Sequence, residues 1–352
     1  MKTKQQMMFA SAIALAFSGT SNAATLNWDG GGGVDNEFST AANWADSVTG
    51  LDAVPANVDT LNILNGSTVS RTVNSAGGRT NIQGGSILNV SAGTHSDGTA
   101  GNTVRNFVGN GSAGTLNVSG GSYDIGHLLA ISHSTNSDGS VNVTGGLLNI
   151  GRGSNSLVGG FGGNFALGHS ISIGSNSGQN NVTGQFTISG GALKTRTGIA
   201  VAHNGTFSQI GSAITEISLG GAAADAGWFA MAGSTSLWNA TIDGGGITKM
   251  FVEAQTNTST LNPFVTILAG STLNLGFTGS AMSGTWTLLE LEGQDIDDQG
   301  LVLSAATLAD PNWSFNVDNS GANGLLTVTY VPEPSSIALL AAGGLLALRR
   351  RR

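Results

Sequence analysis

The sequence contains no cysteine, only five prolines in 352 residues, and few charged residues, which make up 10% of the chain. Without cysteine, the protein forms no disulfide in an oxidising compartment and exposes no reactive thiol there. Its stability must therefore come from packing and from backbone hydrogen bonds.

Glycine and small polar residues fill much of the chain in place of the scarce residue types. Glycine accounts for 55 residues, and serine, threonine and asparagine occupy most polar positions. Such a composition is also found in flexible coils, but 39% of the residues are hydrophobic and they alternate with polar ones. This alternation favours a repetitive β protein over a disordered chain.

The N-terminus has the order of features that is typical of a secretory signal peptide. Lys2 and Lys4 form a basic segment, residues 7–17 are apolar, and Ser21-Asn22-Ala23 supplies small residues before a cleavage point. A buried N-terminal helix is the alternative, but it explains this order less well. The sequence predicts a signal peptide over residues 1–23, with cleavage between Ala23 and Ala24.

The C-terminus carries a short apolar segment followed by arginines. Pro332-Glu333-Pro334 precedes the 14 residues Ser335 to Leu348, and Arg349, Arg350, Arg351 and Arg352 end the chain. The residues expected to contact lipid are Ile337, Ala338, Leu339, Leu340, Leu345, Leu346 and Leu348. A helix of this length covers about 21 Å of a hydrocarbon core about 30 Å thick. The arginines predict a stop to transfer, which leaves the rest of the chain outside the inner membrane.

The motif Pro332-Glu333-Pro334, the short apolar helix and the terminal arginines resemble the PEP-CTERM sorting signal of Gram-negative bacteria. In that family an exosortase, a membrane enzyme similar to a transpeptidase, reads the motif. The resemblance implies a transient inner-membrane intermediate, cleavage near the motif, and delivery to the cell surface, the outer envelope or the extracellular matrix. An ordinary C-terminal membrane tail is the alternative. The resemblance covers residues 332–352 and implies nothing about what the exported body does.

Removal of both terminal segments leaves a strongly acidic chain. Residues 24–331 hold 7 basic and 20 acidic side chains, a net charge of −13. Such a chain is poorly suited to neutralise phosphates, so the charge argues against nucleic-acid binding.

A short repeat recurs between the two terminal segments. Residues 114–121, 139–146 and 184–191 each alternate aliphatic and polar residues and end in Gly-Gly, and two further short strands follow each copy. Three short strands per unit fit one rung of a right-handed parallel β-helix better than a β-sandwich. The residues predicted to point inward in stacked rows are Leu116, Val118, Val141, Val143, Phe186 and Ile188.

The spacing of the units is irregular at one place. Units begin near Phe107, Leu129, Ile171, Ile199 and Trp228, and 42 residues separate the second from the third. Residues 152–170 within this gap are either a loop insertion or a degenerate rung. Continued alternation through Phe165, Leu167, Ile171 and Ile173 favours a rung.

The predicted architecture is an all-β protein with capped ends. Residues 24–80 form a lead-in and N-terminal cap, 81–261 the β-helix repeats, and 262–330 a small antiparallel β cap, before the sorting signal at 331–352. The lead-in, with Trp28 and Trp44, is similar to the opening of secreted bacterial β-helix proteins with autotransporter-associated-type repeats. These two tryptophans either stack on a sugar or plug the end of the coil, and the second interpretation is favoured.

Candidate reactive residues are scattered. The histidines are His95, His127, His133, His169 and His203. His133 and His203 occupy equivalent positions, but Ser175 lies between them, which favours polar turn positions over a metal site. The acidic residues Glu290, Glu292, Asp295, Asp297 and Asp298 form a cluster without the spacing of a calcium loop, so a solvated loop is favoured over a weak calcium site.

No motif for catalysis or for a cofactor is present, and no cofactor is expected. Asp124 with Arg152 or Lys194 is the least unfavourable catalytic set. The predicted function is that of a non-enzymatic surface or matrix protein, with an exosortase-type enzyme and extracellular polysaccharide as partners. A polysaccharide-degrading β-helix enzyme and an adhesin, including an ice-binding one, remain as alternatives.

Overall fold

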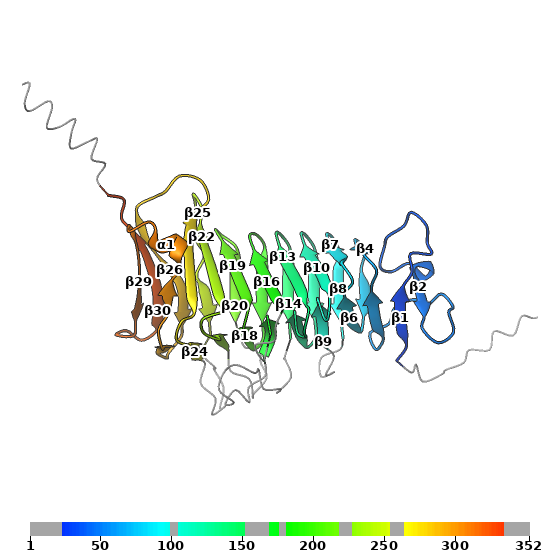
Figure 1. Ribbon diagram of the computed structural model, residues 1–352. Coiled ribbons are helices and arrows are strands. Elements are labelled where there is room, and N and C mark those ends of the chain that lie inside the picture. The colour runs from blue at the N-terminus through cyan, green and yellow to red at the C-terminus, as the bar shows by residue number, and fades with distance from the viewer. Residues whose placement is uncertain are drawn as a thin grey trace, which may run out of the picture.

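The structure, a computed structural model, shows an elongated stack of short strands (Figure 1). The residues it describes are 23–98, 105–151, 169–175, 181–217, 227–253 and 264–333. The N-terminal strands lie at one end of the stack and the C-terminal strands at the other (Figure 1).

Three long sheets run along the stack, and each turn of the chain contributes one strand to each of them. Sheet A, in spatial order, contains β2 (Trp44–Asp46), β1 (Thr25–Trp28), β3 (Thr60–Ile63), β6 (Arg79–Ile82), β9 (Arg105–Val108), β12 (Leu128–Ile131), β15 (His169–Ile173), β18 (Gly198–Val201), β21 (Trp228–Met231), β24 (Phe264–Ile267) and β27 (Ile296–Asp298).

The other two sheets follow the same logic. Sheet B contains β28 (Val302–Leu303), β25 (Thr272–Phe277), β22 (Leu237–Ile242), β19 (Gly205–Ile210), β16 (Thr183–Ile188), β13 (Asp138–Val143), β10 (Ala113–Val118), β7 (Ser86–Val90) and β4 (Thr68–Arg71). Sheet C contains β29 (Trp313–Asp318), β30 (Gly324–Tyr330), β26 (Gly284–Leu291), β23 (Met250–Val252), β20 (Ile214–Ile217), β17 (Ala192–Thr195), β14 (Leu147–Ile150), β11 (Ser122–Ile125), β8 (Thr94–Asp97) and β5 (Ser75–Gly77).

Neighbouring strands are parallel through the body of each sheet. The strands β12, β13 and β14 of one rung pair with β15, β16 and β17 of the next, in the same order. This arrangement is a parallel β-solenoid, as the three-strand repeat predicted. It places the unit starts of the sequence, from β9 to β21, side by side in sheet A.

The predicted inward rows are confirmed. Leu116, Val141 and Phe186 are paired across β10, β13 and β16, and each is at most 1% exposed. The residues Val118, Val143 and Ile188 form the next row, all of them 0% exposed. Burial of each such side chain contributes roughly 1.5 to 3 kcal/mol, and stacking is what makes that burial possible.

Glycine pairs shape the corner between sheets B and C. Gly121, Gly146 and Gly191 have φ angles of 66° to 68°, a region that favours glycine. A Cβ atom on the preceding Gly120 would lie 2.3 Å from the Ser91 carbonyl oxygen. The recurring Gly-Gly therefore lets successive rungs stack closely at this corner.

The structure corrects the interpretation of the 42-residue gap. β14 pairs directly with β17, and β12 pairs directly with β15, so no rung is inserted between them. Residues 152–168 instead connect sheet C to sheet A within one rung. The prediction failed because Ile171 and Ile173, which continued the alternation, belong to β15 itself.

The N-terminal end is closed by an aromatic plug. Trp28 and Trp44 meet edge to face at 5.2 Å between ring centroids, and they are 6% and 0% exposed. The 3-10 helix η1 (Ala41–Asn43) leads into β2, which pairs antiparallel with β1. With both rings buried, neither tryptophan offers an open face to a sugar.

The parallel rungs extend beyond the expected range 81–261 at both ends. β3 pairs in parallel with β1 and β6 at the start, and β24 and β25 continue the parallel sheets at the other end. At the C-terminal end, the antiparallel pairs are β26 with β30 and β30 with β29, and the helix α1 (Ala305–Leu308) precedes β29 and contacts β25.

None of the helices in the described ranges is long and apolar enough to cross a membrane. The predicted span between Ser335 and Leu348 lies outside these ranges, and so do Pro334 and the terminal arginines.

Candidate functional site

The predicted sorting signal begins where the solenoid ends. Tyr330, the last residue of β30, is 7% exposed and packs against Trp313, with 4.8 Å between the ring centroids. The Val331 amide donates to the Asn312 carbonyl at 3.1 Å, and Pro332 and Glu333 are exposed. The chain therefore leaves the fold at the residue where the motif starts.

At the other terminus, the structure describes the chain from Ala23 onward, so the signal peptide itself lies outside the described residues. Ala23 is exposed and Ala24 is half-buried. The Ala24 carbonyl accepts a hydrogen bond from the Thr60 amide at 2.8 Å, which joins the start of β1 to β3. The predicted cleavage point lies next to the first strand pairing of the described residues.

The histidines do not converge. The register of sheet A places Ser175 between His133 and His203, as the equivalent positions of the repeat units predicted. His203 contacts Thr235 at 3.0 Å, while burial lowers the pKa of His133, with a smaller contribution from Arg105. The side chain of His169 lies outside the described part. No group of three or more potential metal ligands occurs within the described residues.

The catalytic candidates lie on the outer face of sheet C but have other partners. Asp124 accepts a hydrogen bond from Asn149 at 2.9 Å, and Lys194 pairs with Glu216 at 2.8 Å. Asn149 sits in register between Asp124 and Lys194, so the two candidates are two strands apart. Arg152 lies outside the described residues.

The acidic cluster extends from the end of β26 through the turn after it to β27. Glu290 pairs with Lys249 and accepts from Asn323 at 2.7 Å, and the Lys249 hydrogen bond is the main cause that lowers the pKa of Glu290. Asp298 accepts hydrogen bonds from two backbone amides, and Asp297 accepts one from the side chain of Gln299. These carboxylates serve local contacts and loop structure.

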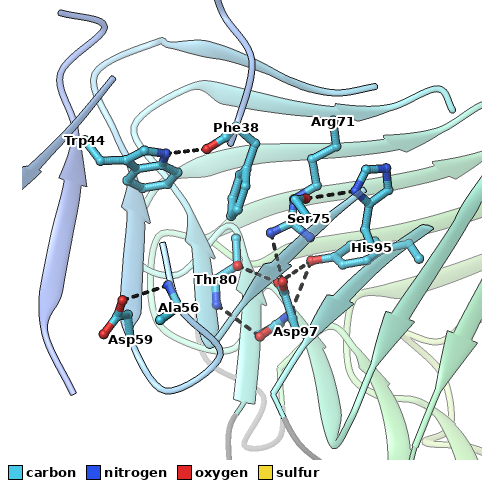
Figure 2. A network of polar contacts seen from close by, with 11 residues as sticks. Phe38, Trp44, Ala56, Asp59, Arg71, Ser75, Thr80, His95 and Asp97 are labelled. Atoms are coloured by element: carbon cyan, nitrogen blue, oxygen red, sulfur yellow. Dashed lines mark hydrogen bonds and ion pairs between the residues drawn. The ribbon is translucent and has the colours of Figure 1, made fainter. Parts of the chain in front are cut away.

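Sequence reasoning missed a buried polar network inside the N-terminal rungs (Figure 2). Arg71 on β4 and Asp97 on β8 form an ion pair at 2.8 Å, and both side chains are 0% exposed. The other Asp97 oxygen accepts from Thr80 at 2.5 Å, Asn106 at 2.9 Å and Tyr123 at 2.5 Å.

Aromatic rings enclose the arginine. The guanidinium carbon of Arg71 lies 3.6 Å from the centroid of the Phe38 ring and 5.0 Å from that of Tyr123. Burial, followed by the charge of Asp97, raises the pKa of Tyr123 well above its ordinary value, so its hydroxyl remains a donor. Because the network is closed to solvent, its chemistry is structural: it holds the lead-in against the first rungs.

The adjacent His95 is part of the same buried region. It is 0% exposed, contacts Ser75 through Nδ1 at 2.9 Å and the Ala92 carbonyl through Nε2 at 2.6 Å. Because a carbonyl only accepts, Nε2 carries the proton and Nδ1 accepts from Ser75. Burial lowers the pKa of His95.

The register of β4 with β7 and of β8 with β11 shows which sequence signal corresponds to this network. Arg71 pairs with Val90, and Asp97 pairs with Ile125, so both charges occupy inward positions that are aliphatic in the neighbouring rung. Two opposite charges at inward positions of adjacent rungs predict a buried pair, but the repeat is too degenerate around β4 for the alternation alone to show that Arg71 points inward.

The outer face of sheet B carries an uncharged polar row. From β4 to β25 the paired positions are Ser70, Asn89, Asn117, Asn142, Thr187, Ser208, Asn239 and Asn274. Side-chain hydrogen bonds join Asn117 to Asn89 at 2.8 Å and Asn142 to Asn117 at 3.0 Å. Successive members lie about 4.8 Å apart, the spacing of paired strands.

The segment that follows β30 is similar to a known sorting motif. Residues 331–352 match the PEP-CTERM protein-sorting motif. The PEP-CTERM match starts at the residue after β30, so the matched segment and the solenoid do not overlap. Comparison with curated proteins and with solved structures gave no match. The PEP-CTERM motif indicates an exported protein that is sorted by an exosortase-type enzyme to the cell surface.

Proposed function

We propose that this chain is a non-enzymatic structural protein of the cell surface or the extracellular matrix. The observation that carries the proposal is the PEP-CTERM motif placed directly after the last strand of a closed solenoid. The body is complete before the motif begins, so cleavage there would release a folded rod.

The finer steps of the route belong to the same proposal. The signal peptide 1–23 starts export, the apolar segment pauses the chain in the inner membrane, and the exosortase-type enzyme cuts near Pro332-Glu333-Pro334. The solenoid is taken to be right-handed, because parallel crossover connections are right-handed in nearly all cases.

The non-enzymatic assignment is supported by the partners of the charged residues. Asp124 and Lys194 are held by Asn149 and Glu216, and the Arg71–Asp97 pair is sealed from solvent. A hydrolase or lyase needs an acid and a base that face one substrate. Turnover of a glycan panel that an Asp124→Asn variant abolishes would contradict this assignment.

The sorting step is tested by fractionating cells that carry an exosortase-type enzyme. We expect the full chain in the surface fraction, and the variant with Pro332→Ala, Glu333→Gln and Pro334→Ala to remain as an uncut inner-membrane species. Ser335→Ala with Ser336→Ala is the matched control and should sort normally. An unchanged distribution of the triple variant would refute the sorting role of the motif.

A second candidate function is binding of an uncharged glycan by the polar row of sheet B. The row and its neighbour, which consists of Thr68, Ile87, Thr115, Ser140, Gln185, Thr206, Leu237 and Thr272, carry no charged side chain. Hydroxyls and amides at a regular spacing suit the hydroxyls of a neutral polysaccharide, while the surrounding acidic surface disfavours an anionic one.

This candidate is tested by co-sedimentation with insoluble cellulose and chitin. Asn142→Lys with Thr187→Lys on the sheet B row should weaken binding at least tenfold, whereas Asn149→Lys on the outer face of sheet C should not. Equal binding by both variants, with folding checked by circular dichroism, would remove the sheet B row as the binding surface.

A further inference from the structure

The start of β1 brings a backbone nitrogen to a buried carboxylate. The Ala24 nitrogen donates to Asp59 Oδ1 at 2.9 Å, and Asp59 is only 6% exposed. The second oxygen, Oδ2, accepts the Ala56 amide at 2.8 Å within the turn that leads into β3 (Figure 2).

The position of Asp59 is held firmly by its surroundings. Its backbone carbonyl accepts the Arg79 amide at 2.8 Å, and a Cβ atom on Gly78 would lie 2.1 Å from that carbonyl oxygen. The Thr60 amide, next along the chain, donates to the Ala24 carbonyl at 2.8 Å. Ala24 and Asp59 are therefore fixed relative to each other by strand pairing on both sides.

The carboxylate has no cationic partner among the residues that the structure describes. Arg79, on the strand packed against it, directs its guanidinium to Asn81 and to the Phe107 ring instead. Burying a carboxylate that accepts hydrogen bonds only from neutral amides costs more free energy than burying one that faces a positive charge.

Processing at the predicted cleavage point supplies that charge. Hydrolysis of the Ala23–Ala24 peptide bond adds water, leaves a carboxylate on Ala23, and converts the Ala24 amide nitrogen into an amine, which takes up a proton near neutral pH. We propose that Asp59 is the receptor for the new α-ammonium group of Ala24, so that removal of the signal peptide creates an ion pair that locks β1 onto β3.

This inference rests on the proposed export, and it gives removal of the signal peptide a structural consequence. In the precursor, Asp59 accepts a neutral N–H; in the mature chain, it faces a cation at the same place. Signal-peptide removal then stabilises the lead-in that closes the N-terminal end of the solenoid.

The test uses mature protein purified from exporting cells. N-terminal sequencing should find Ala24 as the first residue. The amines are then labelled by reductive ¹³C-methylation and titrated by NMR. Residues 24–331 contain only two lysines, Lys194 and Lys249, so the α-amine gives one of very few signals. A free α-amine ordinarily titrates near about 7.7 to 8.0, which is the reference for the measurement.

We expect the α-amine pKa to lie at least about one unit above this ordinary range, because an opposite charge within hydrogen-bond distance favours the charged form. Asp59→Asn should return it to the ordinary range, and Asp52→Asn, which removes an exposed carboxylate of the same lead-in, should leave it raised. The stability from the pair is fully present below about pH 8 and is lost as the pH rises through the raised pKa.

An ordinary α-amine pKa in the wild-type protein overturns the inference even if Asp59→Asn fails to fold. A mature terminus other than Ala24 in an exported protein overturns it as well. Retention of the intact precursor inside the cell is a different outcome, which contradicts the proposed export.

Discussion

At the scale of single residues, the inward positions of the solenoid accept different chemistry as long as neighbouring rungs match it. Arg71 and Asp97 replace aliphatic residues at two inward positions, and each neutralises the other. Thr80, Asn106 and Tyr123 complete the hydrogen bonds of Asp97. Removing one member therefore leaves a buried charge without compensation.

The first prediction concerns this pair. Arg71→Met should lower the free energy of unfolding by about 3 to 5 kcal/mol, because it leaves the Asp97 charge buried and unpaired. Lys194→Met, which breaks the half-exposed pair with Glu216, should cost less than about 1 kcal/mol. Chemical denaturation measures both. The double variant Arg71→Met with Asp97→Asn should cost less than the two single changes together, and strict additivity would argue against the coupling.

A second residue-scale constraint lies on the outer face of sheet A. Trp228 lies over Gly198, where an added Cβ atom would be 2.1 Å from the indole ring. Trp228 also stacks on Phe264, with 5.6 Å between the centroids and 6° between the planes. Gly198 is therefore needed for side-chain packing, since its φ is not in the left-handed region.

We predict that Gly198→Ala destabilises the protein by about 1 to 3 kcal/mol through overpacking. Gly276→Ala is the matched control in a strand of sheet B, because a Cβ atom there meets nothing within 4 Å. Thermal unfolding of both variants is the measurement. A loss at Gly276 equal to that at Gly198 would mean that the strand, and not the indole, sets the requirement.

At the scale of elements, the connection from sheet C to sheet A varies in length while the rungs stay in register. Gly126-His127 joins β11 to β12, and Arg196-Thr197 joins β17 to β18. Between β14 and β15, residues 152–168 separate Gly151 from His169, the first residue of β15. His169 pairs with Gly198 before a register shift, and Ile171 pairs with Leu129 and Ile199. Residues 152–168 are thus additional to the short connection that the neighbouring rungs use at this corner.

Deletion of residues 152–168 should therefore leave the solenoid folded. The deletion joins Gly151 to His169 and leaves β14 and β15 intact, so circular dichroism should keep the strand signal and unfolding should remain cooperative. Deletion of 134–150, which is equally long but removes β13 and β14, should abolish cooperative unfolding. Collapse of the first variant to the level of the second would show that 152–168 is required for the coil.

At the scale of the whole molecule, we expect the edge strands at the ends of the solenoid to determine whether the protein remains monomeric. At the C-terminal end, sheets A and B finish in strands of three and two residues, which are short edges. β26 is eight residues long and is covered by β30 and then β29. The cap is packed onto β25 through aromatic rings, since Phe277 of β25 contacts Trp313 of β29 and Tyr330 of β30.

Removal of residues 309–330 should make the rod self-associate, because the edge of β26 would be exposed for pairing with another chain. Size-exclusion chromatography with light scattering should show a mass that rises with concentration and with salt, since salt screens the net charge of −11 that 7 basic and 18 acidic side chains give residues 24–308. A chain that ends at Tyr330 is the control. A monomeric truncated chain would show that the cap has no protective role.

How far each feature could be predicted depends on the range of the interactions that produce it. The three-strand rung and the inward rows of Leu116 and Val118 follow from alternation within a few residues and from the glycine corners. The place of residues 152–168 did not follow from the sequence, because a segment that continues the alternation resembles a rung until the strands on either side are seen to pair directly with the neighbouring rungs.

The sequence by itself determined the PEP-CTERM motif, the parallel three-strand repeat and the excess of acidic residues, because each depends on local order, periodicity or composition. Only the tertiary structure decided that Arg71 faces Asp97, that Ala24 meets Asp59 and that the tryptophans are buried. These contacts join residues 26, 35 and 16 positions apart in the chain, and they exist only once successive rungs have stacked.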